Sequence, residues 1–261
     1  MKISKICAAL ILGLSFAAAA HNAMAQDSFA LEQRVAEPRF IIDMPTAGML
    51  HRGQFALDAW VFRGGGMTIG IEAGIFNRFM FGISYGGNNV IGTDDITGQK
   101  LPGVNFKYRF IEESFLLPAF VIGFDSQGKE GYIASADRYI IKSPGFYVAA
   151  SKNYSFLGSL SIHGCVNYSL ENVDSKSPDL SAGAEKSLGD AFVFLASYDF
   201  ALNDRNATPG FGEDRGYLDA GVRFIAGGGL SIELDDKNIL GNEQGVPAGD
   251  RTLYINYTQN F

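Results

Sequence analysis

From residue 54 to the end of the chain, apolar and polar residues alternate with a period of two. In the stretch 67–75, for example, Ile69 and Ile71 share one parity, whereas Thr68 and Glu72 share the other. Successive side chains of a strand point to opposite faces, so this alternation predicts strands with one apolar face and one polar face. Twelve such strands are predicted, at 54–62, 67–75, 79–86, 103–110, 115–124, 145–152, 160–168, 180–186, 191–200, 217–224, 230–235 and 251–261.

One predicted strand, 115–124, does not follow the alternation. It is apolar at both parities and contains Pro118, so its orientation does not follow from the sequence.

The lengths of the connections also alternate along the chain. Short turns are expected at 76–78, 111–114, 153–159, 187–190 and 226–229, and long polar loops at 87–102, 125–144, 169–179, 201–216 and 236–250. The connection after the first predicted strand is the exception, because a long loop is expected there but it contains only residues 63–66. Short turns on one rim and long loops on the other are typical of transmembrane β-barrels, and an even strand count puts both chain ends on the same rim.

The last strand has a distinctive end. Leu253, Ile255, Tyr257 and Phe261 share the apolar parity, and the chain stops at Phe261. This stretch resembles the closing strand of bacterial outer-membrane barrels, which ends in Phe and serves as a targeting signal, although Gln259 stands where an aromatic residue is usual. A C-terminal strand of a soluble sandwich is the alternative for this stretch alone.

The first 25 residues have the features of a secretory signal peptide. Lys2 and Lys5 precede an apolar run from Ile6 to Ala20, and Ala23-Met24-Ala25 is a small-x-small cleavage site. Residues 26–53 lack sustained alternation and contain Pro38 and Pro45. We expect them to form a periplasmic lead-in or a segment folded into the mouth of a barrel at 54–261.

The composition agrees with this assignment. The predicted mature chain has 19 basic against 28 acidic residues, a net charge of −9, which argues against nucleic-acid binding. Its one cysteine, Cys165, excludes an internal disulfide. The 32 glycines, 21 phenylalanines and 11 tyrosines suit tight turns and interfacial aromatic girdles. No later run reaches the roughly 18 apolar residues of a spanning helix, so membrane crossing requires strands in a closed barrel.

We therefore predict an all-β fold, a transmembrane antiparallel up-and-down barrel of about twelve strands in the outer membrane of a Gram-negative cell. The expected partners are outer-membrane lipid and the barrel-assembly machinery. The apolar parity then faces lipid and the polar parity faces the lumen. The charged and polar residues expected to line the lumen are Asp58, Glu72, Lys107, Arg109, Lys152, His163, Glu185, Asp199, Asp219, Arg223, Glu233 and Asp235.

Two interpretations of this charged lumen are open. Its ion pairs could hold a barrel open or plugged, because an unpaired buried charge costs several kcal/mol. They could instead form a ring that selects ions or solutes. Seven acids against four bases predict a mild preference for cations in any open pore.

A catalytic role is a further alternative. A membrane hydrolase needs a serine nucleophile with a histidine base, and only His51 and His163 remain after signal removal. His163 shares its parity with Ser161 and Cys165, but that parity is expected to face the lumen and not the bilayer. We expect no catalytic residue, cofactor or metal site. The acidic loop pairs Asp94-Asp95 and Glu213-Asp214 are expected to be solvated.

Four stretches resemble the YjbH-like outer-membrane barrels associated with bacterial exopolysaccharide. They are 45–50 (PTAGML), 101–110 (LPGVNFKYRF), 117–125 (LPAFVIGFD) and 145–152 (GFYVAASK). The resemblance covers about half of the mature chain, and members of that family are generally longer. It implies a role near surface polysaccharide and carries over no catalytic residue. The expected function is a porin-like channel or envelope-transport component for a polysaccharide or small solute; a non-conducting structural or surface-interaction barrel and, more remotely, an outer-membrane hydrolase are the alternatives.

Overall fold

The computed structural model of the chain describes residues 37–171, 175–206, 208–209 and 211–261. The predicted signal peptide at 1–25 and the start of the predicted lead-in, 26–36, lie outside the described residues. Among the residues described, no helix is long and apolar enough to cross a membrane.

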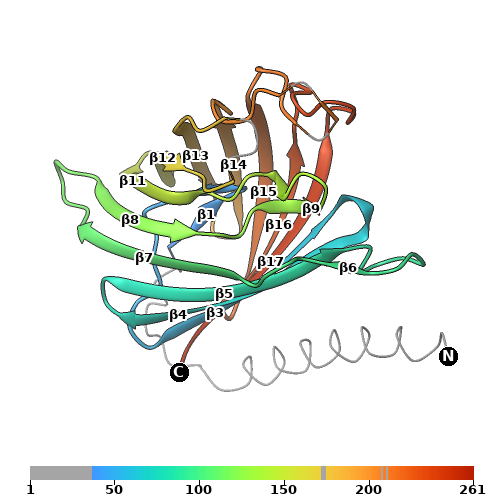
Figure 1. The fold of residues 1–261 in the computed structure, drawn as a ribbon. Coiled ribbons are helices and arrows are strands. Elements are labelled where there is room, and N and C mark those ends of the chain that lie inside the picture. Colours follow the sequence, from blue (N-terminus) through green and yellow to red (C-terminus); the bar gives the residue numbers. More distant parts are fainter. Residues whose placement is uncertain (1–36, 172–174, 207, 210) are drawn as a thin grey trace. The chain divides into compact units, whose positions relative to one another are not determined.

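Twelve antiparallel strands close into a barrel (Figure 1). Each strand pairs with its neighbours in the barrel, and β17 pairs with β3 to complete the ring, so the barrel has no free edge. The predicted fold class is confirmed. The barrel strands are β3 (Gln54–Phe62), β4 (Gly66–Phe76), β5 (Phe79–Asn88), β7 (Gly103–Ile111), β8 (Ala119–Asp125), β11 (Gly145–Ser155), β12 (Ser159–Tyr168), β13 (Asp179–Leu188), β14 (Phe192–Asp199), β15 (Tyr217–Gly227), β16 (Leu230–Lys237) and β17 (Asp250–Asn260).

The prediction for residues 115–124 is partly wrong. The strand there, β8, begins only at Ala119, and residues 112–118 form the turn before it, in which Phe115 is 95% exposed. Pro118 precedes the first paired residue because it has no N–H for the strand ladder. The structure also orients this strand: Ala119 and Val121 are buried toward the lumen, whereas Ile122 is exposed on the outer face.

The two rims differ in the length of their connections. Turns such as 77–78 and 228–229 join strands at what we call the short-turn rim. The opposite, long-loop rim carries β6 (Thr97–Gly98), the hairpin of β9 (Lys129–Ile133) and β10 (Arg138–Ile141), and the 3-10 turn η1 (Arg63–Gly65). We call residues 126–144, which contain β9 and β10, the loop hairpin.

The two faces of the barrel wall differ in chemistry, as the alternation predicts. The outer face is apolar: Ile71, Ile83 and Val148, for example, are each close to half exposed. The inner face is polar on most strands, as shown by buried Asp58 and Glu72 on β3 and β4. An apolar outer band on a closed barrel is the arrangement that a bilayer requires.

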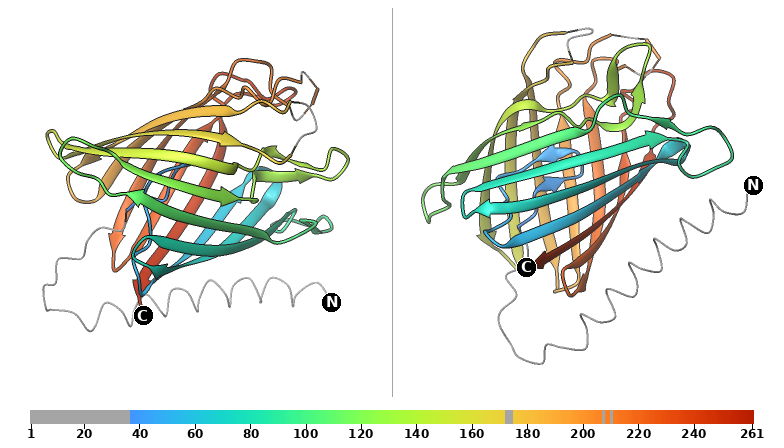
Figure 2. Two further views of the ribbon diagram at one scale, coloured as in Figure 1. Left: turned by 60° about the vertical axis from the view of Figure 1, so that its left-hand side comes forward. Right: turned by 60° about the horizontal axis from the view of Figure 1, so that its bottom comes forward.

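Residues 37–50 lie inside the barrel. They form a hairpin with two short strands, β1 (Phe40–Ile41) and β2 (Met44–Pro45), which pair with each other and with no barrel strand. Both ends of the hairpin lie at the short-turn rim, where Gly53 bonds to Gly74 and Phe261, and the chain crosses the lumen toward the other rim (Figure 2). We call residues 37–50 the plug hairpin.

The chain terminus completes the seam between β3 and β17. The Phe261 N–H donates to the Gly53 carbonyl at 2.8 Å, and its ring lies 6.3 Å from that of Phe55, while the side chain remains 81% exposed. An exposed aromatic ring at the rim suits the membrane interface.

We expect Phe261→Asp to lower the membrane-fraction abundance of the protein more than Asn260→Asp does. The first change places a charge at the apolar interface and alters the predicted targeting signal, whereas Asn260 is already polar and exposed. Immunoblots of membrane fractions measure the difference. Equal abundance of the two variants would contradict this role of the terminal strand.

Candidate functional site in the barrel lumen

The structure places eleven of the twelve residues expected in the lumen on the inner face. Those that are buried are Asp58, Glu72, Lys107, Arg109, His163, Asp219, Glu233 and Asp235. Glu185, Asp199 and Arg223 share the inner parity of their strands and are partly buried.

Lys152 is the exception, and its placement in the lumen was wrong. It pairs across the sheet with outward-facing Ile162, whereas its neighbour Ser151 points inward. Its ammonium group lies 3.3 Å from Glu113 in the turn of the short-turn rim and also donates to the Ser114 carbonyl. The weak contrast between parities in β11 is the reason that the sequence did not orient this residue.

A buried ion-pair cluster holds the plug hairpin to one wall. Arg39 of the plug hairpin donates to both oxygens of Asp58 on β3, at 2.7 and 3.0 Å, and also to Glu72 on β4. Asp58 accepts further hydrogen bonds from the Tyr254 hydroxyl at 2.6 Å and from Asn256 at 2.8 Å, both on β17. One carboxylate therefore connects the plug hairpin to both strands of the barrel seam.

Lys107 on β7 binds the backbone of the plug hairpin. Its ammonium group donates to the carbonyls of Arg39, Thr46 and Gly48, at 3.2, 3.0 and 2.9 Å. The three N–H bonds of a lysine are thereby all used on one hairpin. Gly48 is needed at this close approach, because a Cβ there would lie 2.1 Å from the Pro38 carbonyl oxygen.

Two arginines complete the polar contacts. Arg109 on β7 pairs with Glu37 and donates to the Ala47 carbonyl at 2.7 Å. Arg223 on β15 lies 3.2 Å from Glu185 and 2.6 Å from Glu233, and donates to the Phe40 carbonyl at 3.3 Å. These arginines lie on β7 and β15, so polar contacts reach the plug hairpin from well-separated parts of the wall.

The other side of the plug hairpin is apolar. Met49 and Leu50 are buried in one cluster with Ala119 and Val121 of β8 and Tyr147 of β11. This contact explains why β8 is apolar at both parities: one face meets lipid and the other meets the plug hairpin.

The tip of the plug hairpin reaches the long-loop half of the lumen. Lys237, at the end of β16, lies 2.6 Å from Asp43 at this tip and 2.8 Å from Glu130 in the loop hairpin. The two hairpins enter from opposite rims and meet at this lysine.

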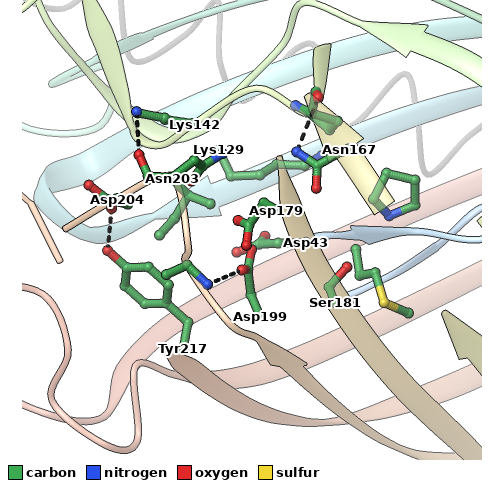
Figure 3. Close-up of a pocket in the computed structure, with 15 residues that line it drawn as sticks. Asp43, Lys129, Lys142, Asn167, Asp179, Ser181, Asp199, Asn203, Asp204 and Tyr217 are labelled. Atoms are coloured by element: carbon green, nitrogen blue, oxygen red, sulfur yellow. Dashed lines mark hydrogen bonds between the residues drawn. The ribbon is translucent and has the colours of Figure 1, made fainter. Parts of the chain in front are cut away.

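Buried contacts also fix the loop hairpin itself. Arg138 donates to Asp204 at 2.7 Å. The Tyr217 hydroxyl donates to the other Asp204 oxygen at 2.8 Å (Figure 3). Burial alone would raise the pKa of Asp204, but the hydrogen bonds and charge of Arg138 hold it below its ordinary value. Glu171 accepts from the backbone N–H groups of Tyr139 and Ser143, both at 2.9 Å.

Three carboxylates converge on Arg63 at the long-loop rim. Arg63 lies 3.4 Å from Glu130 and 3.3 Å from Asp250, and also donates to Glu243. Burial, followed by the charge of Glu130, raises the pKa of Glu243 to about 7, even though Arg63 opposes the shift. Glu243 lies in a loop that bonds to 211–213 through Glu213 N–H and Gln244 N–H.

Small cavities lie in the described part of the lumen. A cavity of about 40 Å³ is lined by Asp43, Lys129, Asp179 and Asp199, among others, and a neighbouring one measures about 10 Å³. A single water needs roughly 10 to 15 Å³ on this measure, so these cavities hold a few waters at most. The plug and loop hairpins together close the barrel.

Ser151 and His163 form a hydrogen bond of 2.7 Å between Oγ and Nδ1 in the lumen. Ser151 also accepts from the Ala47 N–H at 2.8 Å, so the serine holds the plug hairpin. The other ring nitrogen, Nε2, is buried and bonds to no group in the described part of the chain. Among the described residues, no carboxylate bonds to this histidine as in a catalytic triad, and the pair faces the lumen.

Several of these residues have no direct signal in the sequence. Arg39, Asp43 and Lys129 lie in segments without alternation, and Lys237 lies just past the predicted end of its strand. The apolar inner face of β8 was the available signal, because an inward apolar face requires a partner inside the barrel.

Comparisons with known proteins place the barrel among solved structures only at low similarity. No family model and no curated protein matches the chain. A solved KdgM porin is 8% identical, with 80% of this chain and 99% of that chain covered and a TM-score of 0.48. A NanC porin is also 8% identical, covering 79% and 99%, with a TM-score of 0.43. The translocator domain of the autotransporter NalP from Neisseria meningitidis is 14% identical, covering 80% and 86%, with a TM-score of 0.37.

Arg39→Leu is expected to destabilise the seated plug hairpin by about 3 to 5 kcal/mol, because it leaves Asp58 and Glu72 buried without their cation. Combining it with Asp58→Asn and Glu72→Gln is expected to cost less, because no unpaired charge remains. The Thr46 N–H donates to the Arg39 carbonyl, so its hydrogen-exchange rate reports opening of the plug hairpin in both variants. A triple variant as unstable as the single one would show that charge pairing does not hold the plug.

The contact between loop residues 211–213 and 242–244 is expected to weaken as pH rises. Glu243 has a raised pKa in the folded loop, so its stabilising contribution is present below pH 4.5 and is lost as pH rises through about 7. Protection factors of the Glu213 and Gln244 amides should fall at least tenfold over this range. Glu243→Gln should remove the dependence, whereas Asp214→Asn, at an exposed site in the same loops, should retain it. A pH-independent wild type would refute the prediction.

Proposed function

We propose that the protein is a plugged solute channel of a Gram-negative outer membrane and that the plug hairpin gates it. One observation carries the proposal. The plug hairpin enters and leaves the lumen at the same rim and pairs with no barrel strand. It can therefore leave the lumen without threading and without breaking the barrel.

The contacts of the plug hairpin support reversible seating. Its hold on the β3, β4 and β7 walls is polar, through Arg39 and Lys107. Water can replace such hydrogen bonds when the hairpin leaves, whereas a lumen filled by apolar wall side chains has no comparable exchange. The polar inner wall left behind would suit a water-filled passage.

The charge of the wall indicates the class of solute. Without Lys152, the predicted lumen set contains seven carboxylates against three basic residues. Rings of acidic side chains favour cations. We therefore infer that the open channel prefers cations over anions.

The setting in the cell follows from separate features. The apolar outer band and Phe261 support insertion into the outer membrane by the barrel-assembly machinery. The resemblance to YjbH-like barrels adds a place near surface polysaccharide. This resemblance concerns the location of the channel in the cell envelope and does not identify the solute.

A non-conducting structural barrel is the second candidate. The loops at the long-loop rim support it, since residues 211–213 bond to 242–244 and the isolated bridge Gly212–Glu243 joins them. A lid of this kind would also suit a surface-interaction role.

A reversible disulfide separates the two candidates. An ideal Cβ at Gly183 on β13 lies 3.6 Å from Ile41 Cγ2 of the plug hairpin and 2.9 Å from the flexible end of Met44, so Ile41→Cys with Gly183→Cys is designed to form a disulfide once Met44 shifts. Cys165→Ser removes the remaining cysteine of the predicted mature chain. In planar bilayers, the oxidised variant should be silent, and reduction should give cation-preferring conductance steps.

A single-cysteine variant and a deletion variant serve as controls. Cys165→Ser with Ile41→Cys alone should conduct under both redox conditions. A variant lacking residues 37–50 should conduct more often than the wild type, because only the loop hairpin then remains to close the barrel. Silence of the deletion variant, with its barrel shown to be folded by heat-modifiable gel migration, would favour the structural barrel. Anion preference would contradict the inferred role of the acidic wall.

A further inference from the structure

The ammonium group of Lys129 lies in an aromatic cage inside the lumen. Its Nζ is 4.0 Å from the ring centroid of Trp60 on β3 and 4.6 Å from that of Phe40 on the plug hairpin. The two rings meet edge to face at 6.2 Å, and Tyr254 stacks on Trp60 at 4.8 Å. Three elements therefore build one cage around a cation.

Lys129 differs from the other buried cations in how it is held. Within the described ranges, no oxygen accepts a hydrogen bond from its Nζ and no carboxylate pairs with it directly. By contrast, Lys107 donates to three carbonyls, and Lys237 pairs with two carboxylates. Ring faces and surrounding charge alone hold this ammonium group.

The ring faces favour a cation, but burial does not favour a lysine in particular. Burial lowers the pKa of Lys129, the more distant carboxylates Asp125, Asp43 and Asp58 oppose that shift, and the charge of Lys237 adds to it. An ammonium group that keeps unused N–H donors loses hydration without replacing it. A quaternary ammonium ion has no N–H to satisfy, and aromatic cages recognise such ions.

The position of the cage fits a ligand that arrives from the long-loop side. Lys129 belongs to the loop hairpin and lines the cavity of about 40 Å³ beside Asp179 and Asp199. Outward movement of the loop hairpin would vacate the lysine volume and leave Trp60 and Phe40 in place. The vacated volume adds to the cavity already present.

We propose that the Trp60–Phe40 cage is a binding site for organic ammonium cations and that Lys129 is a built-in competitor that occupies it in the closed form. The inference deepens the proposed channel function by naming a solute class. A bound cation would take the place of Lys129 while the plug hairpin, which carries Phe40, is still seated, and it would hold the loop hairpin away from the lumen. The cage is therefore a site that the solute occupies before the plug hairpin leaves.

Trp60 makes the test direct, because it is the only tryptophan of the chain. The folded full-length mature protein in detergent is titrated with choline while Trp60 fluorescence is recorded. The neutral isostere 3,3-dimethylbutan-1-ol serves as the ligand control. The wild type should respond to choline and not to the alcohol.

Removing the competitor should strengthen the response. Lys129→Met should lower the half-saturating choline concentration at least tenfold, whereas Lys129→Arg should not. Lys176→Met, which removes the same charge from an exposed loop position, should behave like the wild type. Adding Phe40→Leu to Lys129→Met should raise the half-saturating concentration at least tenfold, because it removes one wall of the cage.

Several results would overturn the proposal. They are an equal response to choline and its isostere, no choline response in folded Lys129→Met, or an unchanged half-saturating concentration in that variant. If Lys129→Met does not fold, Lys129→Gln takes its place under the same expectations. Choline binding in a barrel that never conducts would overturn the channel function alone. Conductance without choline binding would overturn the cage alone.

Discussion

The seated plug hairpin depends on ion pairs between its own charged side chains and those of the barrel wall. A guanidinium or carboxylate group in a low-dielectric interior costs several kcal/mol unless an opposite charge and hydrogen bonds compensate it. Asp58 and Glu72 lie on adjacent strands with almost no exposure, and the charge that compensates them comes from Arg39, outside the barrel strands. The plug hairpin is therefore an electrostatic part of the barrel wall as well as an obstruction within it.

The same constraint explains why two hairpins fill one lumen. Lys237 at the long-loop end faces Asp43 from the plug hairpin and Glu130 from the loop hairpin, so each hairpin supplies a charge that the wall lacks. Where the wall offers few charges, as along β8 and β11, the contact with the plug is apolar instead. The inner surface of the wall therefore contacts the hairpins through polar groups in some places and through apolar groups in others. Together these contacts fill the interior.

The barrel itself was predictable from the sequence, whereas its contents were only partly so. Period-two alternation determines which parity meets lipid, because a bilayer tolerates few polar side chains on the outer face. The lumen imposes no such uniform rule, because each inward side chain is constrained by the particular residues that it contacts. Lys152 was misplaced because β11 alternates weakly, and Arg39 and Lys129 were not found because their segments do not alternate at all. Their roles depend on contacts between residues far apart in the chain, such as Arg39 with Glu72, which local patterns do not encode.

The position of Asp58 has a consequence for assembly. This carboxylate accepts hydrogen bonds from Arg39 of the plug hairpin and from Tyr254 and Asn256 of the last strand. The plug hairpin precedes the first barrel strand in the sequence, and β17 is the last strand of the ring. When the plug hairpin is absent, Asp58 keeps only the neutral partners Tyr254 and Asn256 and faces the open lumen. Seating the hairpin adds the charge of Arg39 at the carboxylate that also joins β3 to β17, so filling the interior also strengthens the seam of the barrel.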